Sequence, residues 1–194
     1  MKVLVVYVSM HHGNTREIAE VIAEVLQAPL KRVDEVSVGE VEGYELIGFG
    51  SGIYGGRHHK GLLGFVEKLP SCFGKKAFIF STKGGTPTFL NHWLLRKRLL
   101  SKGFEVLGEF SCKGFDTFGP LRFIGGLNKG RPNERDLSNA RVFAEGLKSK
   151  AVFFWLTVFY AMFICIFFLT SRPFGTSSLA SMYHWILLFI PLSI

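Results

Sequence analysis

The chain has 194 residues, enough for one domain of ordinary size and an additional segment. Its formal net charge of +8 favours anionic partners. The basic residues are scattered, however, and no helix-turn-helix, zinc-finger or RNA-binding pattern occurs, so nucleic acid is not expected. The three cysteines, Cys72, Cys112 and Cys165, form no CxxC pair, which argues against a disulfide framework and fits a reducing compartment.

Short apolar runs alternate with amphipathic stretches over the first 150 residues. The first run is rich in β-branched residues without polar alternation, as in a parallel strand covered on both faces. The predicted strands are Lys2–Val8, Leu30–Val33, Tyr44–Gly50, Ala77–Ser81 and Phe104–Phe110. The predicted helices, which place apolar residues at helical spacing, are Asn14–Leu26, Lys60–Leu69, Phe89–Leu100 and Asp136–Leu147.

This alternation predicts an α/β domain with a parallel sheet between two helical layers. Five strands in roughly 150 residues fit the strand order 2-1-3-4-5. Only a short segment with Gly39 and Gly43 separates the second and third strands, so no full helix is expected there. Ligands of such sheets bind outside the carboxyl ends of the strands, which directs attention to the loops after the first, third and fourth strands.

The composition changes sharply after the last predicted helix. Residues Ala151–Thr170 form a run of 20 residues without charge, and Arg172 is the only charged side chain beyond it. At about 1.5 Å per residue, a helix of this length covers about 30 Å, the thickness of a bilayer core. We therefore expect a folded domain over residues 1–149 and a hydrophobic membrane-anchoring tail over residues 150–194, with a transmembrane helix at about 151–170.

The two ends of the predicted domain indicate its location. The first eight residues are too short for the core of a signal peptide, and His11, His12 and Gly13 follow instead of a small-residue cleavage site. Lys148 and Lys150 stand just before the uncharged run, and the cytoplasmic flanks of membrane spans favour Lys and Arg. We expect a single-pass protein of the cell membrane with its domain in the cytoplasm and membrane lipid as one partner.

The run Ser9-Met10-His11-His12-Gly13-Asn14-Thr15 joins the first strand to the first helix. Ser9 and Thr15 supply hydroxyl groups, Gly13 permits a tight turn, and the N–H groups at a helix start suit a phosphate dianion. The run contains neither Gly-Lys-Ser/Thr nor GxGxxG. A nucleoside triphosphate is therefore disfavoured, and a terminal monophosphate fits better.

This run resembles the phosphate loop of flavodoxins, Ser/Thr-x-Thr-Gly-Asn-Thr followed after three residues by an alanine, here Ala19. His11 and His12 stand where that family often has a threonine or another small residue. The resemblance covers residues 1–149 and implies a flavodoxin-like fold, noncovalently bound FMN and electron transfer. Most familiar flavodoxins are acidic, so the basic balance of this chain is a departure.

Two further runs match the flavodoxin pattern. Gly50–His59 resembles the loop that wraps the isoalloxazine ring, and the ring of Tyr54 is expected to stack on the flavin. Ser81–Thr86 matches in position the loop on the other side of the ring. The FMN-binding residues that the resemblance implies are Ser9, Met10, His11, His12, Gly13, Asn14, Thr15, Ser51, Gly52, Ile53, Tyr54, Gly55, Ser81, Thr82, Lys83, Gly84 and Gly85.

Four histidines fall on two loops that should converge, namely His11, His12, His58 and His59. Adjacent histidines point apart, and no Cys, Asp or Glu joins them at ligand spacing, so a metal site is not expected. Solvent-exposed side chains, or protonatable groups near the cofactor, are the favoured interpretation.

The leading hypothesis is FMN-dependent electron transfer to a redox partner protein or a small-molecule acceptor. One alternative is an oxidoreductase acting on a membrane-associated quinone or protoporphyrinogen. Tyr54–His59 loosely resembles a loop of the flavodoxin-like protoporphyrinogen oxidases, but the long inserted loop of those enzymes is not seen. Another alternative is a cofactor-free, membrane-tethered interaction module, against which the phosphate loop counts.

Overall fold

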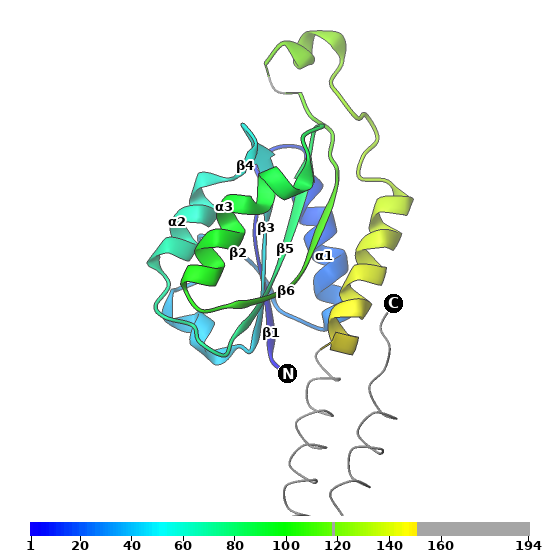
Figure 1. Ribbon diagram of the computed structural model, residues 1–194. Coiled ribbons are helices and arrows are strands. Elements are labelled where there is room, and N and C mark those ends of the chain that lie inside the picture. The colour runs from blue at the N-terminus through cyan, green and yellow to red at the C-terminus, as the bar shows by residue number, and fades with distance from the viewer. Residues whose placement is uncertain (118, 151–194) are drawn as a thin grey trace, which may run out of the picture. The chain divides into compact units, whose positions relative to one another are not determined.

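The computed structural model describes residues 1–117 and 119–150, which lie in one compact unit. A central sheet separates two layers of helices (Figure 1). The strands are β1 (Val3–Val8), β2 (Leu30–Arg32), β3 (Leu46–Tyr54), β4 (Arg57–His58), β5 (Lys76–Lys83) and β6 (Glu105–Lys113). The helices are α1 (Asn14–Leu26), α2 (Lys60–Lys68), α3 (Thr88–Ser101) and one over residues 134–150, with 3-10 turns η1 (Gly39–Gly43) and η2 (Gly119–Ile124).

The principal strands run parallel in the order β2-β1-β3-β5-β6, which matches the predicted order 2-1-3-4-5. Helix α1 and the helix over 134–150 cover one face of the sheet, and α2 and α3 cover the other (Figure 1). Every predicted helix is present, and α1 has the predicted bounds. Only the short turn η1 lies between β2 and β3, as the length of that segment indicated.

Strand β1 shows why the sheet could be recognised from sequence. Leu4 and Val6 pack with α2 and α3, whereas Val3 and Val5 pack with α1 and the helix over 134–150. Both faces of the strand are therefore buried, and all six residues are apolar. The absence of polar alternation follows directly from this two-sided burial.

The predicted end of the third strand at Gly50 is wrong. Strand β3 continues through Gly50 to Tyr54 and pairs with β5 from Leu46 to Gly52. A Cβ atom at Gly48 would lie 2.3 Å from the Phe78 ring, and one at Gly50 would lie 2.1 Å from the Phe80 ring. These glycines make room for aromatic side chains on the neighbouring strand and do not end the strand.

The predicted open loop over Gly50–His59 is also corrected. Gly55 and Gly56 have φ angles of +56° and +75° and form a two-residue turn between β3 and β4. Tyr54 and Arg57 face each other across this antiparallel hairpin. The sheet therefore has six strands, one of them antiparallel, in place of five parallel strands.

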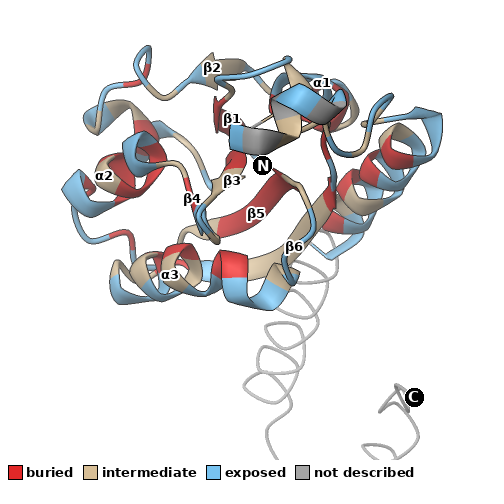
Figure 2. Cartoon of the chain, turned by 90° about the horizontal axis from the view of Figure 1, so that it is seen from above, coloured by how far each residue is buried: buried red, intermediate tan, exposed pale blue. Residues whose placement is uncertain are grey.

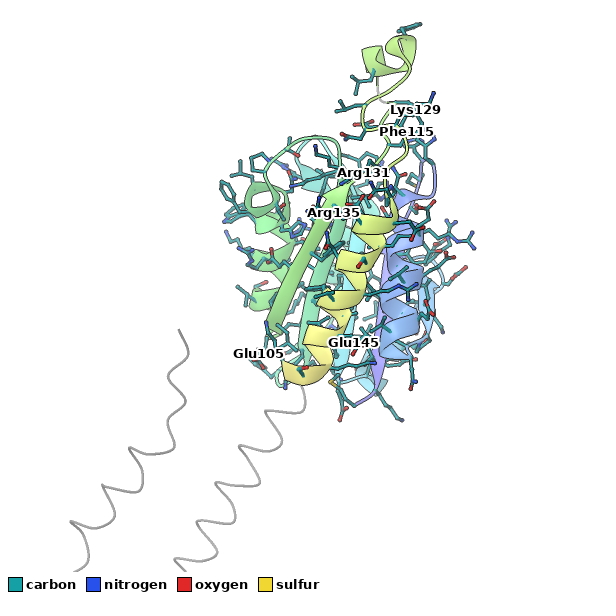
Figure 3. All side chains as sticks on the ribbon, turned by 90° about the vertical axis from the view of Figure 1, so that its right-hand side faces the viewer. Glu105, Phe115, Lys129, Arg131, Arg135 and Glu145 are labelled. Atoms are coloured by element: carbon teal, nitrogen blue, oxygen red, sulfur yellow. The ribbon has the colours of Figure 1, made fainter. Side chains whose placement is uncertain are left out.

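The helix over 134–150 runs along the sheet from one end to the other. Figure 3 shows Arg135 near its upper end and Glu145 near its lower end, with Phe115 and Lys129 above the sheet. At the lower end the Lys150 ammonium donates to the Leu107 carbonyl at 3.0 Å, near the start of β6.

Within residues 1–117 and 119–150, no helix combines the length and the apolar character needed to cross a bilayer. The expected span at about 151–170 lies outside the described residues. The transmembrane helix and the division into a domain and a membrane-anchoring tail remain predictions.

Candidate functional site

Three loops meet above the carboxyl ends of β1, β3 and β5. Figure 2 looks down on this end, with α1 on one side of the sheet and α2 and α3 on the other. The loops are the predicted phosphate loop Ser9–Thr15, the β3–β4 hairpin, and the connection from β5 to α3. A fourth segment, residues 114–117 and 119–128, contacts the first and third of these loops.

The phosphate loop has the backbone of an anion site. His12 and Gly13 have φ angles of +56° and +75°, and this left-handed pair turns the chain from β1 into α1. No side chain caps the helix start, so the N–H groups of its first turn are left for an incoming acceptor. Met10, His11 and His12 are exposed around this turn. Only a residue that tolerates positive φ fits at position 13 without strain.

Asn14 and Thr15 point inward and fasten the loop to the domain. The Asn14 amide donates to the Phe115 carbonyl at 2.8 Å. The buried hydroxyls of Thr15 and Thr82 are hydrogen-bonded at 2.8 Å, which ties the first turn of α1 to the end of β5. His12 Nε2 and the Thr117 hydroxyl form a further contact at 2.8 Å. Both the shape of the loop and its height above the sheet are therefore set by neighbouring segments.

Tyr54 stands at the tip of the hairpin between several polar groups. Its ring centre lies 5.4 Å from that of His59 in an edge-on arrangement and 6.3 Å from that of His11. Partial burial raises the pKa of its hydroxyl, and the nearby Asp116 carboxylate adds to this increase. The hairpin thus brings an aromatic ring beside His11 of the phosphate loop. The expected contact of Tyr54 with a flavin remains a prediction.

The connection from β5 to α3 is anchored rather than free. The Lys83 ammonium donates to the Thr88 hydroxyl at 2.5 Å, and burial lowers the Lys83 pKa. The Asn128 amide donates to the Gly84 carbonyl at 2.7 Å, and a Cβ atom at Gly84 would lie 3.0 Å from Asp116. Asn128, which follows the η2 turn, therefore holds this loop in place. Gly85 is exposed at its tip.

Ser51 and Ser81 lie in the interior, although the sequence placed both at the cofactor. Ser51 Oγ and His58 Nδ1 are hydrogen-bonded at 2.9 Å, and Ser81 Oγ and His92 Nε2 at 2.7 Å. All four side chains are buried. Neither serine is exposed at the candidate site. Gly52 and Ile53 likewise belong to strand β3.

A carboxylate completes this buried network. His92 Nδ1 lies 3.0 Å from one Glu109 oxygen, and the Arg96 guanidinium donates to the other. Because a carboxylate only accepts, Nδ1 of His92 carries a proton. Burial would raise the Glu109 pKa, but the hydrogen bonds from His92 and Arg96 outweigh it and lower the pKa to about 2. Burial, and secondarily His92, lower the pKa of His58 to about 3.

This buried network was not expected from the sequence. One signal was available for His92, because it shares helical spacing with the buried Leu95 and Leu99 of α3. The pairing of Ser51 with Ser81 depends on the register between β3 and β5, which follows from the pairing of distant segments. His58 belongs to the interior because the unexpected hairpin carries it there.

Comparison with known proteins agrees with this arrangement. The flavodoxin domain family matches residues 4–107. An uncharacterized protein of Methanocaldococcus jannaschii is 51% identical over 150 residues, which cover 76% of this chain and 98% of that protein.

Two solved structures share the fold at low identity. Oxidised flavodoxin 2 from Bacillus cereus has a TM-score of 0.61 and 22% identity, over 77% of this chain and 99% of its own. Rubredoxin oxygen:oxidoreductase from Desulfovibrio gigas has a TM-score of 0.59 and 17% identity, over 77% of this chain but only 37% of its own.

The family match spans more than half of the sequence, and the relative from Methanocaldococcus jannaschii is matched nearly end to end. The six-stranded sheet with its order β2-β1-β3-β5-β6 is the corresponding architecture. This chain therefore belongs to the flavodoxin domain family.

Proposed function

We propose that residues 1–150 bind FMN and that the protein transfers electrons. The observation that carries the proposal is the uncapped start of α1 behind the left-handed residues His12 and Gly13. This anion site lies beside an aromatic hairpin and a glycine-containing loop. Membership of the flavodoxin domain family supports the same ligand.

Each part of the site suits one part of FMN. The N–H groups of the first turn of α1 would hold the phosphate. Tyr54 on the hairpin and the loop over Lys83–Gly85 would flank the isoalloxazine ring. Bound FMN would supply one- or two-electron chemistry, and the chain would orient the ring and limit its contact with water. The acceptor would be a redox partner protein or a small molecule.

The test is a titration of the purified full-length protein with FMN and, separately, with riboflavin, which lacks the phosphate. Bound flavin is followed by its absorption near about 450 nm and by quenching of its fluorescence. We expect FMN to bind at least tenfold more tightly than riboflavin. Equal affinities would refute the phosphate site, and no binding of either flavin would favour the cofactor-free alternative.

We also propose that Ala151–Thr170 anchors the protein in the cell membrane with the folded domain in the cytoplasm. The 20 uncharged residues and the preceding Lys148 and Lys150 support this. Carbonate washing of membranes tests the anchor, and protease added to spheroplasts tests the orientation. Release of intact protein by carbonate would refute the anchor. Digestion of the domain from outside would refute the orientation.

A further inference from the structure

A second concave site lies on the side of the hairpin that faces α2 and α3. The cavity measures about 690 Å³. Its apolar lining includes Leu63, Gly64 and Leu94, and its polar lining includes Arg57 and Lys60. A volume of this size is typical of pockets that enclose a small organic molecule.

The charges around this cavity do not balance. The Arg98 guanidinium pairs with the Glu67 carboxylate at 2.9 Å, and these two residues neutralise each other. Arg57 and Lys60 are exposed, and within residues 1–117 and 119–150 no carboxylate lies in ion-pair distance of either. Two uncompensated positive charges therefore border an apolar cavity, and they favour an anionic group.

His59 adds a hydrogen-bond donor, because the tautomer of its ring is fixed by a backbone contact. Its Nδ1 accepts the Gly61 N–H at 3.1 Å and caps the start of α2. A nitrogen that accepts a hydrogen bond carries no proton, so Nε2 of the neutral ring holds the N–H. Burial lowers the His59 pKa, and the neighbouring Lys60 adds to the decrease, which favours the neutral ring. The His59 side chain lines the cavity.

This cavity adjoins the place proposed for the flavin ring and shares Met10, His11 and Tyr54 with the predicted FMN-binding residues. The residues Lys83–Gly85, which are proposed to flank the flavin ring, do not line the cavity. Tyr54 belongs to both sites, and its ring contacts the His59 ring edge-on. Met10 and His11 of the phosphate loop form the edge nearest the proposed phosphate site. The two sites would thus be neighbours separated by one aromatic side chain.

We propose that this cavity binds a small aromatic carboxylate. The flat apolar body would lie against Leu63, Gly64 and Leu94, and the carboxylate would face Arg57 and Lys60. The His59 N–H would add a hydrogen bond to the same group. The ligand class follows from an apolar lining combined with excess positive charge, and it does not depend on whether flavin is bound.

The experiment uses a matched pair of probes, 1-naphthoate and 1-naphthalenemethanol, which share a ring system and differ in charge. Each is titrated calorimetrically into full-length protein in a nonionic detergent, after subtraction of a titration into detergent alone. We expect 1-naphthoate to bind one site at least tenfold more tightly than the alcohol. Equal affinities would overturn the proposal.

Two pairs of variants locate the bound probe. The double variant Arg57→Gln/Lys60→Gln should lower the affinity for 1-naphthoate by about tenfold. Lys97→Gln on the outer surface should leave this affinity unchanged. Gly64→Leu should abolish binding by filling the cavity, since a Cβ atom at this helical position meets nothing within 4 Å. Gly146→Leu is its control, because it is also helical with nothing within 4 Å.

Unchanged affinity in either test variant, or equal loss in its control, would overturn the location. The same titrations are repeated with saturating FMN. Displacement of 1-naphthoate by FMN would show that the cavity belongs to the cofactor site and would overturn a separate site. Failure of FMN to bind, seen in the flavin absorption, would refute the proposed function and leave the naphthoate result standing.

Discussion

The ring centres of His58 and His92 lie 4.9 Å apart in the interior. Each histidine is hydrogen-bonded to a serine, and the two serines lie on neighbouring strands. The two serines, Ser51 and Ser81, are register partners between β3 and β5. A polar layer therefore crosses the core just below the candidate site. Ser81 also donates to Ser111 on β6 at 3.0 Å, which extends the layer to a third principal strand.

The first prediction concerns stability in acid. The pKa of His58 is about 3 in the folded protein, against an ordinary value of 6.5. Between these values the unfolded chain binds a proton that the folded protein does not. The free energy of unfolding should therefore fall as the pH drops from about 6.5 toward 3, by up to about 1.4 kcal/mol per pH unit.

Urea unfolding followed by circular dichroism from pH 7 to pH 4.5 measures this slope. Glu109, with a pKa lowered from 4.5 to about 2, adds its own loss only below this range. His58→Gln should remove most of the slope, while His12→Gln at an exposed position should leave it unchanged. The same slope in both variants would contradict the assignment to His58.

The second prediction concerns the turn into α1. Gly13→Ala places a side chain at φ +75°, and Gly74→Ala does so at φ +80°, with nothing within 4 Å in either case. Both variants should therefore lose similar stability, about 1–2 kcal/mol. Only Gly13→Ala should also lower the affinity for FMN, by about fivefold to tenfold, because only that turn shapes the phosphate site. Equal FMN affinities in the two variants would count against the site.

The third prediction separates two roles of the Thr15 hydroxyl. Thr15→Val and Thr82→Val each break the hydrogen bond between these residues, at a cost of about 1 kcal/mol of stability. If the Thr15 hydroxyl also donates to the phosphate, Thr15→Val should in addition reduce the free energy of FMN binding. The loss should be about 1.5–3 kcal/mol, as for a charge-assisted hydrogen bond. Riboflavin binding should not change. A similar loss of FMN affinity in both valine variants would show that Thr15 acts only as an anchor.

The fourth prediction concerns the hairpin aromatic. Tyr54→Leu should lower the affinity for FMN, restore part of the flavin fluorescence and shift the reduction potential of the bound flavin. Each change follows from loss of the stacked tyrosine ring. Tyr54→Phe keeps the ring and should resemble the parent protein in all three measurements. Spectroelectrochemical titration with both variants provides the test. A leucine variant with the potential and quenching of the parent would rule out contact between Tyr54 and the flavin.

The fold could be predicted from sequence where a local pattern determined the outcome. Two-sided burial made β1 apolar throughout, and helical spacing gave both ends of α1. The end of β3 could not be predicted because Gly48 and Gly50 respond to Phe78 and Phe80 on another strand. That relationship is tertiary, whereas the sequence pattern reports a local preference for turns.

In the candidate site too, features set by local sequence could be predicted, and features set by tertiary contacts could not. The turn at Gly13 follows from its position between a strand and a helix, and Tyr54 occupies the hairpin tip beside it. The inward direction of Ser51 and Ser81 depends on strand register, and the anchoring role of Asn128 depends on the return of a distant segment. Neither the strand register nor the Asn128 contact can be predicted from the residues adjacent in sequence.

The fit of Gly50 beneath the Phe80 ring also limits the order in which mutations can accumulate. A Cβ atom at position 50 would lie 2.1 Å from that ring, so alanine is excluded while the phenylalanine remains. Phe80→Leu alone would leave a void in a fully buried position, and a later Gly50→Ala would partly fill it. We therefore expect the two changes to be epistatic, with Phe80→Leu favoured as the first step and Gly50→Ala as the second.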